Sequence, residues 1–286
     1  MDQRKQEDGR NQATGQGACV FTDTMAEMTY KEVEASIQRG AIGLWAMGVI
    51  EQHGPHLPTG TDVYIPGARL RAVKAHLSQA GIEALIIPPF YWGVNFVSAS
   101  FPASIKVRAE VMIELLTDVM KSLGQDGMRR MFLISGHNDR AHNQALVAAV
   151  RKGREESGLQ PWFVCDRIVA ERLGHGPGDP DVLPFEAPPE PDGAYLDIHA
   201  GAVETSIMLG CNPGLVRRET LPGLKPTNLQ ASDLAQWRHG YETAKKVTPQ
   251  GYFGAPADAT PQRGSALLEN EAGAIAAVIE HQVRRA

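Results

Sequence analysis

Residues 41–62 read AIGLWAMGVIEQHGPHLPTGTD and join an apolar run to a loop that carries histidines and carboxylates. The apolar part, 41–50, is typical of a buried strand. The loop that follows carries Glu51, His53 and Asp62, with His56 between them. A second apolar run, 131–134, leads in the same way into a polar segment with His137. The fold is therefore expected to place histidine and carboxylate side chains where its strands end.

Strand-like and helix-like segments alternate along the chain. Strands are predicted at 41–50, 84–87, 131–134 and 161–165, and the second of these is expected to end at Pro88 and Pro89. A polar loop is predicted at 51–63, followed by a helix to about residue 80. Further helices are predicted at 29–40, 108–123, 141–156, from near 202, and at 263–283. Thr29 and Glu32 form a capping-box pattern at the first helix. The alternation predicts an α/β fold, a three-layer α/β/α sandwich with a mostly parallel central sheet.

Two segments differ in composition from the rest. Residues 1–24 are polar, rich in Gln and Gly and without periodicity, so they are expected to form a disordered leader. Residues 174–194 are rich in Gly, Pro and Asp and predict a long surface loop. No composition shift divides residues 25–286, which are expected to form one domain.

Composition and charge narrow the class of function. Of the 286 residues 43% are hydrophobic, enough for a sizeable core, and the formal net charge of −5 argues against a nucleic-acid or anionic-membrane surface. No apolar run has the length of a transmembrane helix, and the first residues lack the apolar centre of a secretory signal. Three scattered cysteines do not make a disulfide framework or a zinc–thiolate site. A soluble, cytoplasmic globular protein is expected.

Two polar clusters follow predicted strands. Glu51, His53 and Asp62 form the first, and His137 with Asp139 form the second. Carboxylates and imidazoles are the ligands that suit Zn(II), Mn(II) or Fe(II). The ligand crevice of an open α/β sheet lies beyond the carboxyl ends of its strands, so the two clusters can converge. The alternatives are a surface loop whose polar residues cap helices, and Asp139 as the cap of the following helix.

A third cluster, 197–206, contains His199 and Glu204, five residues apart at the start of a predicted helix. His199 can act as a catalytic acid or base that Glu204 orients. The alternative is that His199 is only a structural residue, packed at the start of the helix. His56 either contributes to the first cluster or holds its loop. The remaining histidines are expected on the surface: His76, His142, His175, His239 and His281.

These segments resemble the creatininase (creatinine amidohydrolase) family. The resemblance covers about residues 40–275 and rests on EQHGPHLP (51–58) with Asp62, SGHN (135–138), HAGAVETS (199–206) and FPASI (101–105). It implies a layered fold that holds two divalent metal ions (zinc, manganese or iron). It also implies a homo-oligomer, a hexamer in the family's assemblies.

The resemblance also implies roles for individual residues. Glu51 and His137 would bind one metal and His53 the other, with Asp62 bridging them. The second metal would take a carboxylate from Asp139, or from Glu204 in its place, because creatininase itself has Tyr-Glu where this chain has Asn138-Asp139. His199 would be the catalytic histidine, oriented by Glu204. The substrate pocket would contain Asn95, Ser98, Asn138 and Tyr195, the last at the position of a tryptophan in creatininase.

Together these features predict a metal-dependent amidohydrolase. It would cleave a non-peptide C–N bond in a small cyclic or linear amide, a creatinine-like lactam or a formamide, with a metal-activated water. A serine nucleophile is disfavoured because the chain has no Gly-x-Ser-x-Gly turn, and a cysteine nucleophile because the cysteines lie in apolar runs without a histidine nearby in sequence. The alternative from another class is a non-catalytic ligand-binding or assembly module with a degenerate metal site. The completeness of the set Glu51, His53, Asp62 and His137 favours the enzyme.

Overall fold

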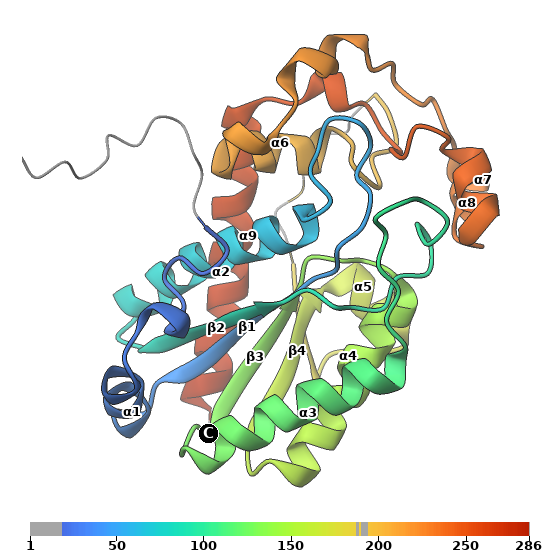
Figure 1. The fold of residues 1–286 in the computed structure, drawn as a ribbon. Helices are drawn as coiled ribbons and strands as arrows, with labels where there is room; N and C mark the ends of the chain where they lie inside the picture. The colour runs from blue at the N-terminus through green and yellow to red at the C-terminus, as the bar shows by residue number, and fades with distance from the viewer. Residues whose placement is uncertain (1–18, 187–188, 190–193, 286) are drawn as a thin grey trace, which may run out of the picture.

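A five-stranded sheet runs through the centre of the protein, with its strands in the order β2-β1-β3-β4-β5 and every neighbouring pair parallel (Figure 1). The computed structural model describes residues 19–186, 189 and 194–285. The strands are β1 (Ile42–Met47), β2 (Ala84–Phe90), β3 (Arg130–Ser135), β4 (Gln160–Asp166) and β5 (Val182–Phe185). The prediction of a parallel sheet is confirmed.

Helices cover both faces of this sheet (Figure 1). The covering helices are α2 (Thr61–Gln79) and α9 (Pro261–Arg284) on one face, and α3 (Ala109–Gln125) and α4 (Arg140–Glu156) on the other. Successive strand residues point to opposite faces, so Leu44 joins the core under α2 and α9 while Trp45 joins the core under α3 and α4. The predicted three-layer α/β/α sandwich is confirmed.

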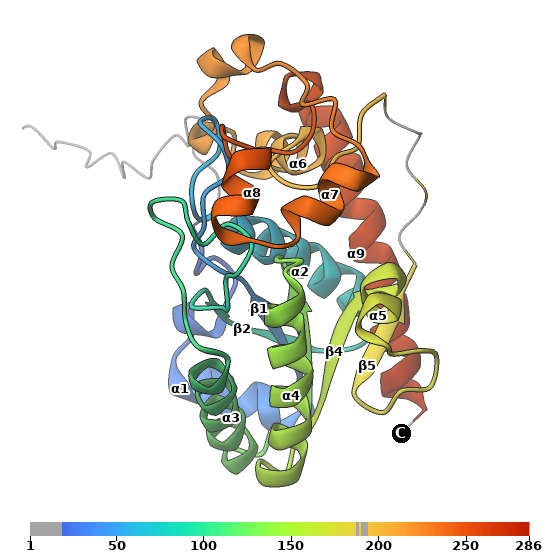
Figure 2. The same cartoon turned by 90° about the vertical axis from the view of Figure 1, so that its right-hand side faces the viewer.

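The described residues also form five shorter α-helices. They are α1 (Tyr30–Gln38), α5 (Arg167–Leu173), α6 (Ala202–Cys211), α7 (Ala231–Trp237) and α8 (Tyr241–Val247). Helices α6, α7 and α8 lie beyond the carboxyl ends of the strands (Figures 1 and 2). The predicted capping box of Thr29 and Glu32 is present at the start of α1. No helix in the described part of the chain is long and apolar enough to span a bilayer.

The structure corrects three predictions. Strand β2 continues through Pro88 and Pro89, because it lies at an edge of the sheet where a missing N–H is tolerated. Part of the predicted loop 174–194 is strand β5, which pairs with β4 at the other edge. In the predicted leader, residues 19–24 form a turn and Thr24 bridges to Ile86, so the ordered chain begins before residue 25. Residues 1–18 lie outside the described part.

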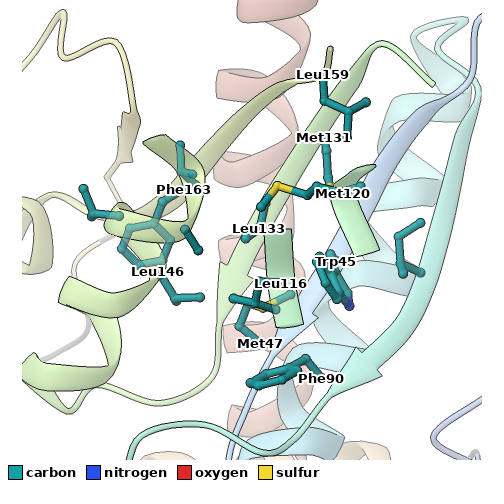
Figure 3. Close-up of a cluster of buried hydrophobic side chains, with 14 of the residues drawn as sticks. Trp45, Met47, Phe90, Leu116, Met120, Met131, Leu133, Leu146, Leu159 and Phe163 are labelled. Atoms are coloured by element: carbon teal, nitrogen blue, oxygen red, sulfur yellow. The ribbon is translucent and has the colours of Figure 1, made fainter. Parts of the chain in front are cut away.

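The core between the sheet and helices α3 and α4 is built from large apolar side chains (Figure 3). Leu116 and Met120 of α3 gather there with Met131 and Leu133 of β3, and all four are fully buried. This layer holds β3 in place and therefore fixes the end of the strand from which His137 follows.

Replacing Leu116 by alanine is expected to lower the free energy of unfolding by about 2–5 kcal/mol, because it leaves a cavity in this layer. The neighbouring Leu115 is 43% exposed and serves as the control. Leu115→Ala is expected to change stability by less than about 0.5 kcal/mol. Urea unfolding followed by circular dichroism measures both, and equal losses would contradict the assigned core face of α3.

Candidate metal centre

The first turn of α2 packs directly against the ends of β1 and β3. A Cβ atom at Gly48 would lie 2.2 Å from the backbone oxygen of Asp62, and one at Gly136 would lie 2.8 Å from the same oxygen. Both positions therefore require glycine. The chain leaves β1 and β3 toward opposite faces of the sheet, so this contact brings Asp62 to a topological switch point, where α/β sheets bind ligands.

Asp62 lies between two histidines. Its Oδ1 atom is 3.2 Å from Nε2 of His53, and its Oδ2 atom is 2.9 Å from Nδ1 of His137. All three side chains are buried. Each oxygen of one carboxylate faces a different imidazole, which is the geometry needed to bridge two cations.

Glu51 lies beside His137, with its Oε1 atom 3.2 Å from Nδ1 of the imidazole. Its other oxygen accepts a hydrogen bond of 3.1 Å from Nδ2 of Asn95 and a second from the hydroxyl of Ser98. Asn95 and Ser98 were predicted in the substrate pocket. In the structure they contact Glu51, and among the described residues neither lines the adjoining cavity. Their hydrogen bonds fix the orientation of the carboxylate.

His53 and Glu204 form the other side of the cluster. The Nδ1 atom of His53 is 3.2 Å from the backbone oxygen of Glu51, which leaves Nε2 facing Asp62. The Oε2 atom of Glu204, in the first turn of α6, is 3.8 Å from the same Nε2. That oxygen also accepts a 2.6 Å hydrogen bond from the backbone N–H of Ala200. Glu204 is therefore held next to His53.

Asp139 makes a different set of contacts. Its Oδ1 atom accepts a hydrogen bond of 2.8 Å from the backbone N–H of Ala141 and caps α4. Its Oδ2 atom accepts bonds of 2.9 and 3.0 Å from the N–H groups of Phe96 and Val97. The structure therefore brings Glu204, and not Asp139, together with His53 and Asp62, and it favours the capping alternative for Asp139.

His199 lies beside this cluster with its ring centroid 4.4 Å from that of His53. Its Nε2 atom is 2.9 Å from the backbone oxygen of Gln52 and 3.1 Å from the side-chain Nε2 of the same residue. A carbonyl oxygen can only accept, so the shorter contact favours a proton on Nε2. The Nδ1 atom, 3.8 Å from Oε1 of Glu51, then carries the free lone pair.

The electrostatics of the cluster favour cations. Burial opposes protonation of His53, but the attraction of Asp62, Glu204 and Glu51 and the hydrogen bond to Asp62 together outweigh it and raise the pKa of the imidazole to about 10. Burial likewise opposes protonation of His137, yet attraction and hydrogen bonds to Glu51 and Asp62 together raise its pKa well above the usual value. The pKa values of Glu51 and Asp62 are lowered against the effect of burial by the neighbouring histidines. Without metal, protons on the imidazoles balance the buried carboxylates.

Three overlapping groups of side chains have ligand atoms close enough to share an ion. They are Glu51 with Asp62 and His137, His53 with Asp62 and Glu204, and Glu51 with His53 and His199. Apart from their ion-pair contacts within the cluster, Nε2 of His53 and Oδ2 of Asp62 are buried and have no hydrogen-bond partner. Buried polar atoms without partners are costly, so a cation bound to them relieves this cost. The mixed nitrogen and oxygen set fits zinc, manganese or iron.

A cavity of about 450 Å³ opens onto this cluster. Glu51, Asp62, His137, His199 and Glu204 line it together with Phe96, Asn138 and Trp237. Tyr195 is half-buried and, within the described part of the chain, does not line it. Trp237 at the end of α7 supplies the aromatic wall instead, with its ring centroid 5.9 Å from that of His199. The sequence pattern gives no sign of Trp237 as a cavity residue, because it does not predict α7.

Two other histidines are also fully buried. His142 was predicted on the surface, but its ring packs against that of His137 at a centroid distance of 5.2 Å, and burial lowers its pKa well below the usual value. His142 therefore stays neutral and packs against a candidate ligand. The Nε2 atom of His56 is 2.9 Å from the Thr205 hydroxyl, so His56 ties the loop after β1 to α6.

Comparisons with known proteins identify the family of the chain. The model of the creatininase family, described as creatinine amidohydrolase, matches residues 26–279. A mycofactocin precursor peptide peptidase of Mycobacterium ulcerans (strain Agy99) is 32% identical over 226 residues, which cover 78% of each chain. A creatinine amidohydrolase of Pseudomonas putida is 26% identical over 253 residues, 86% of this chain and 91% of that protein.

Solved structures show the same fold. A crystal structure of creatinine amidohydrolase (creatininase) superposes with a TM-score of 0.68 at 22% identity and covers 91% of this chain and 97% of its own. A manganese form and a zinc–zinc form of creatininase are 21% identical, with TM-scores of 0.66 and 0.65 over 92% of this chain and 98% and 97% of theirs.

Replacing Asp139 by alanine is expected to lower the free energy of unfolding by about 2 kcal/mol, because the cap of α4 and the bonds to Phe96 and Val97 are lost together. Urea unfolding measures the change. Asp126, the exposed residue that ends α3, gives the control: Asp126→Ala is expected to cost less than about 0.5 kcal/mol. An Asp139→Ala protein as stable as the parent would contradict the capping role.

Proposed function

The chain belongs to the creatininase family, and from that premise we propose that it is a metal-dependent hydrolase that cleaves the C–N bond of a small cyclic or linear amide with water. The observation that carries the proposal is the position of Asp62, whose two carboxylate oxygens face His53 and His137 at the edge of the cavity. Glu51 and Glu204 complete a ligand group on either side.

Two divalent ions are proposed as cofactors. Glu51, Asp62 and His137 would hold one, and His53, Asp62 and Glu204 the other. Such ions supply an acidified water and polarise the amide carbonyl. The relatives of known structure include manganese and zinc forms, which supports either of these metals ahead of iron.

His199 is proposed to carry the proton in this reaction. Hydrolysis places the oxygen of water on the acyl carbon, breaks the C–N bond and transfers a proton to the leaving nitrogen. The contact of Nε2 with the Gln52 carbonyl leaves Nδ1 of His199 free to accept a proton and then donate it. Asn95 and Ser98 keep Glu51 oriented throughout, and the apolar faces of Trp237 and Phe96 exclude water from the cavity wall.

The class of amide has two candidates. The first is a non-peptide amide, a creatinine-like lactam or a formamide, which the creatinine amidohydrolase relative and the size of the cavity support. The second is the end of a short peptide, which the relative named as a precursor peptide peptidase supports. A non-catalytic module that keeps the fold is the contrasting hypothesis. Location in the cytoplasm and assembly into a hexamer stay predictions.

Metal content distinguishes the two candidate carboxylates of the second site. The parent protein, purified without chelators, is expected to hold close to two divalent ions per chain. Glu204→Gln is expected to hold one, because His53 and Asp62 then lack a third ligand. Asp139→Asn, the matched control, is expected to keep both ions. Elemental analysis by mass spectrometry measures the content.

The opposite pattern, loss of an ion in Asp139→Asn alone, would make Asp139 the ligand. A parent protein that holds no metal after incubation with zinc, manganese or iron would contradict the hydrolase and favour the non-catalytic module.

Replacing His199 by alanine is expected to lower kcat by about 10²–10⁴ while both ions stay bound, because only the proton carrier is removed. Turnover of creatinine, an N-formyl amine and a short peptide is measured as the release of the product carboxylate or amine. Loss of an ion in His199→Ala would instead make His199 a metal ligand, as its position beside Glu51 and His53 allows.

A further inference from the structure

Three arginines line the cavity in addition to the candidate metal ligands. Arg140 begins α4, Arg172 lies in α5 and Arg238 follows directly after α7. Three separate elements therefore direct cationic side chains to one cavity. Figure 2 shows α7 and α8 above the end of α4 at which Arg140 lies.

The position of Arg172 is electrostatically unfavourable in the protein alone. Burial lowers the pKa of its guanidinium, and the charges of Arg238 and, to a lesser extent, Arg140 lower it further, while Asp139 raises it by less than Arg238 lowers it. The Nε atom of Arg172 is buried and has no hydrogen-bond partner, although its Nη2 atom donates to the backbone oxygen of Asn138 at 2.8 Å. Arg140 and Arg238 are exposed, so the cost of like-charge repulsion falls on the half-buried Arg172.

The carboxylates near this end of the cavity compensate the three charges only in part. Across the described ranges, none of the three arginines forms an ion pair with a carboxylate. Asp139 is the acidic residue nearest in sequence to Arg140, and both of its oxygens are occupied by backbone N–H groups. The other acidic residues of the cavity, Glu51, Asp62 and Glu204, belong to the metal centre.

The cavity therefore has one end lined by carboxylates and histidines and another end lined by arginines. We propose that Arg140, Arg172 and Arg238 bind a carboxylate of the substrate, so that the amide cleaved is an N-acyl amino acid, a class that includes the carboxyl-terminal residue of a short peptide. This inference rests on the proposed hydrolase function, since it names the substrate of the same site. Guanidinium groups bind carboxylates through paired, charge-assisted hydrogen bonds, and the hydrolysed bond lies close to the carboxylate in such compounds.

A matched pair of probes tests the proposal: N-benzoylglycine and its carboxamide, N-benzoylglycinamide, which differ only in the charged group. Isothermal titration into the metal-loaded full chain measures the binding of each. The carboxylate is expected to bind at least about tenfold more tightly than the carboxamide, the size of one good charge-assisted contact. The double variant Arg172→Gln with Arg238→Gln is expected to reduce this preference to less than about twofold.

Arg129→Gln is the control, because Arg129 is exposed and precedes β3 at the end of the sheet opposite to the cavity. It is expected to keep the full preference. Equal binding of the two probes to the parent, or no binding of the carboxylate at millimolar concentration, would overturn the proposal. A preference that persists in the double variant would also overturn it, since the carboxylate would then be bound at the metal centre.

Turnover of the same probes separates this inference from the hydrolase function. Release of glycine or glycinamide reports hydrolysis of either compound. Arginine-dependent binding without hydrolysis would support the carboxylate site and count against the hydrolase. Hydrolysis of both probes at equal kcat/KM would support the hydrolase and exclude the carboxylate preference.

Discussion

The close packing of α2 against the ends of β1 and β3 is the constraint on which the rest of the site depends. Gly48 and Gly136 allow the Asp62 backbone to approach both strands, and only this approach places one carboxylate between His53 and His137. A side chain at either glycine would move the first turn of α2 outward. The two histidines would then remain at the ends of their strands without the group that joins them.

This packing also places negative charges together in the interior of the protein. Glu51 and Asp62 are buried side by side, and buried carboxylates are stable only when positive charge compensates them. In the protein alone, protons on His53 and His137 provide it, which is why their pKa values are raised. Divalent ions held by these side chains would provide the same charge, so the buried carboxylates that are costly for the fold would favour metal binding.

The sequence predicts four of the five strands, the layers and most candidate ligands, because hydrophobic periodicity and the ends of strands are local features. It places the start of α2 too late, since Gly60 precedes the helix without a side-chain cap and gives no local signal. It gives no sign of α7 either, a seven-residue helix whose residues Ala231–Trp237 include none that is buried. Trp237 and Arg238 were missed for this reason. The contacts of Asn95 and Ser98 with Glu51 join residues more than forty positions apart and follow only from the tertiary structure.

The use of Asp139 as a cap makes the second half of the metal centre depend on a distant part of the chain. Asp139 is bound by local backbone N–H groups, and Glu204 comes instead from α6. Helix α6 is joined to the loop after β1 by His56 and Thr205 and packs on α9. The first group of ligands follows from the sheet and α2 alone. The second group of candidate ligands forms only when α6 packs in place, so it depends on the folding of the region beyond the strands.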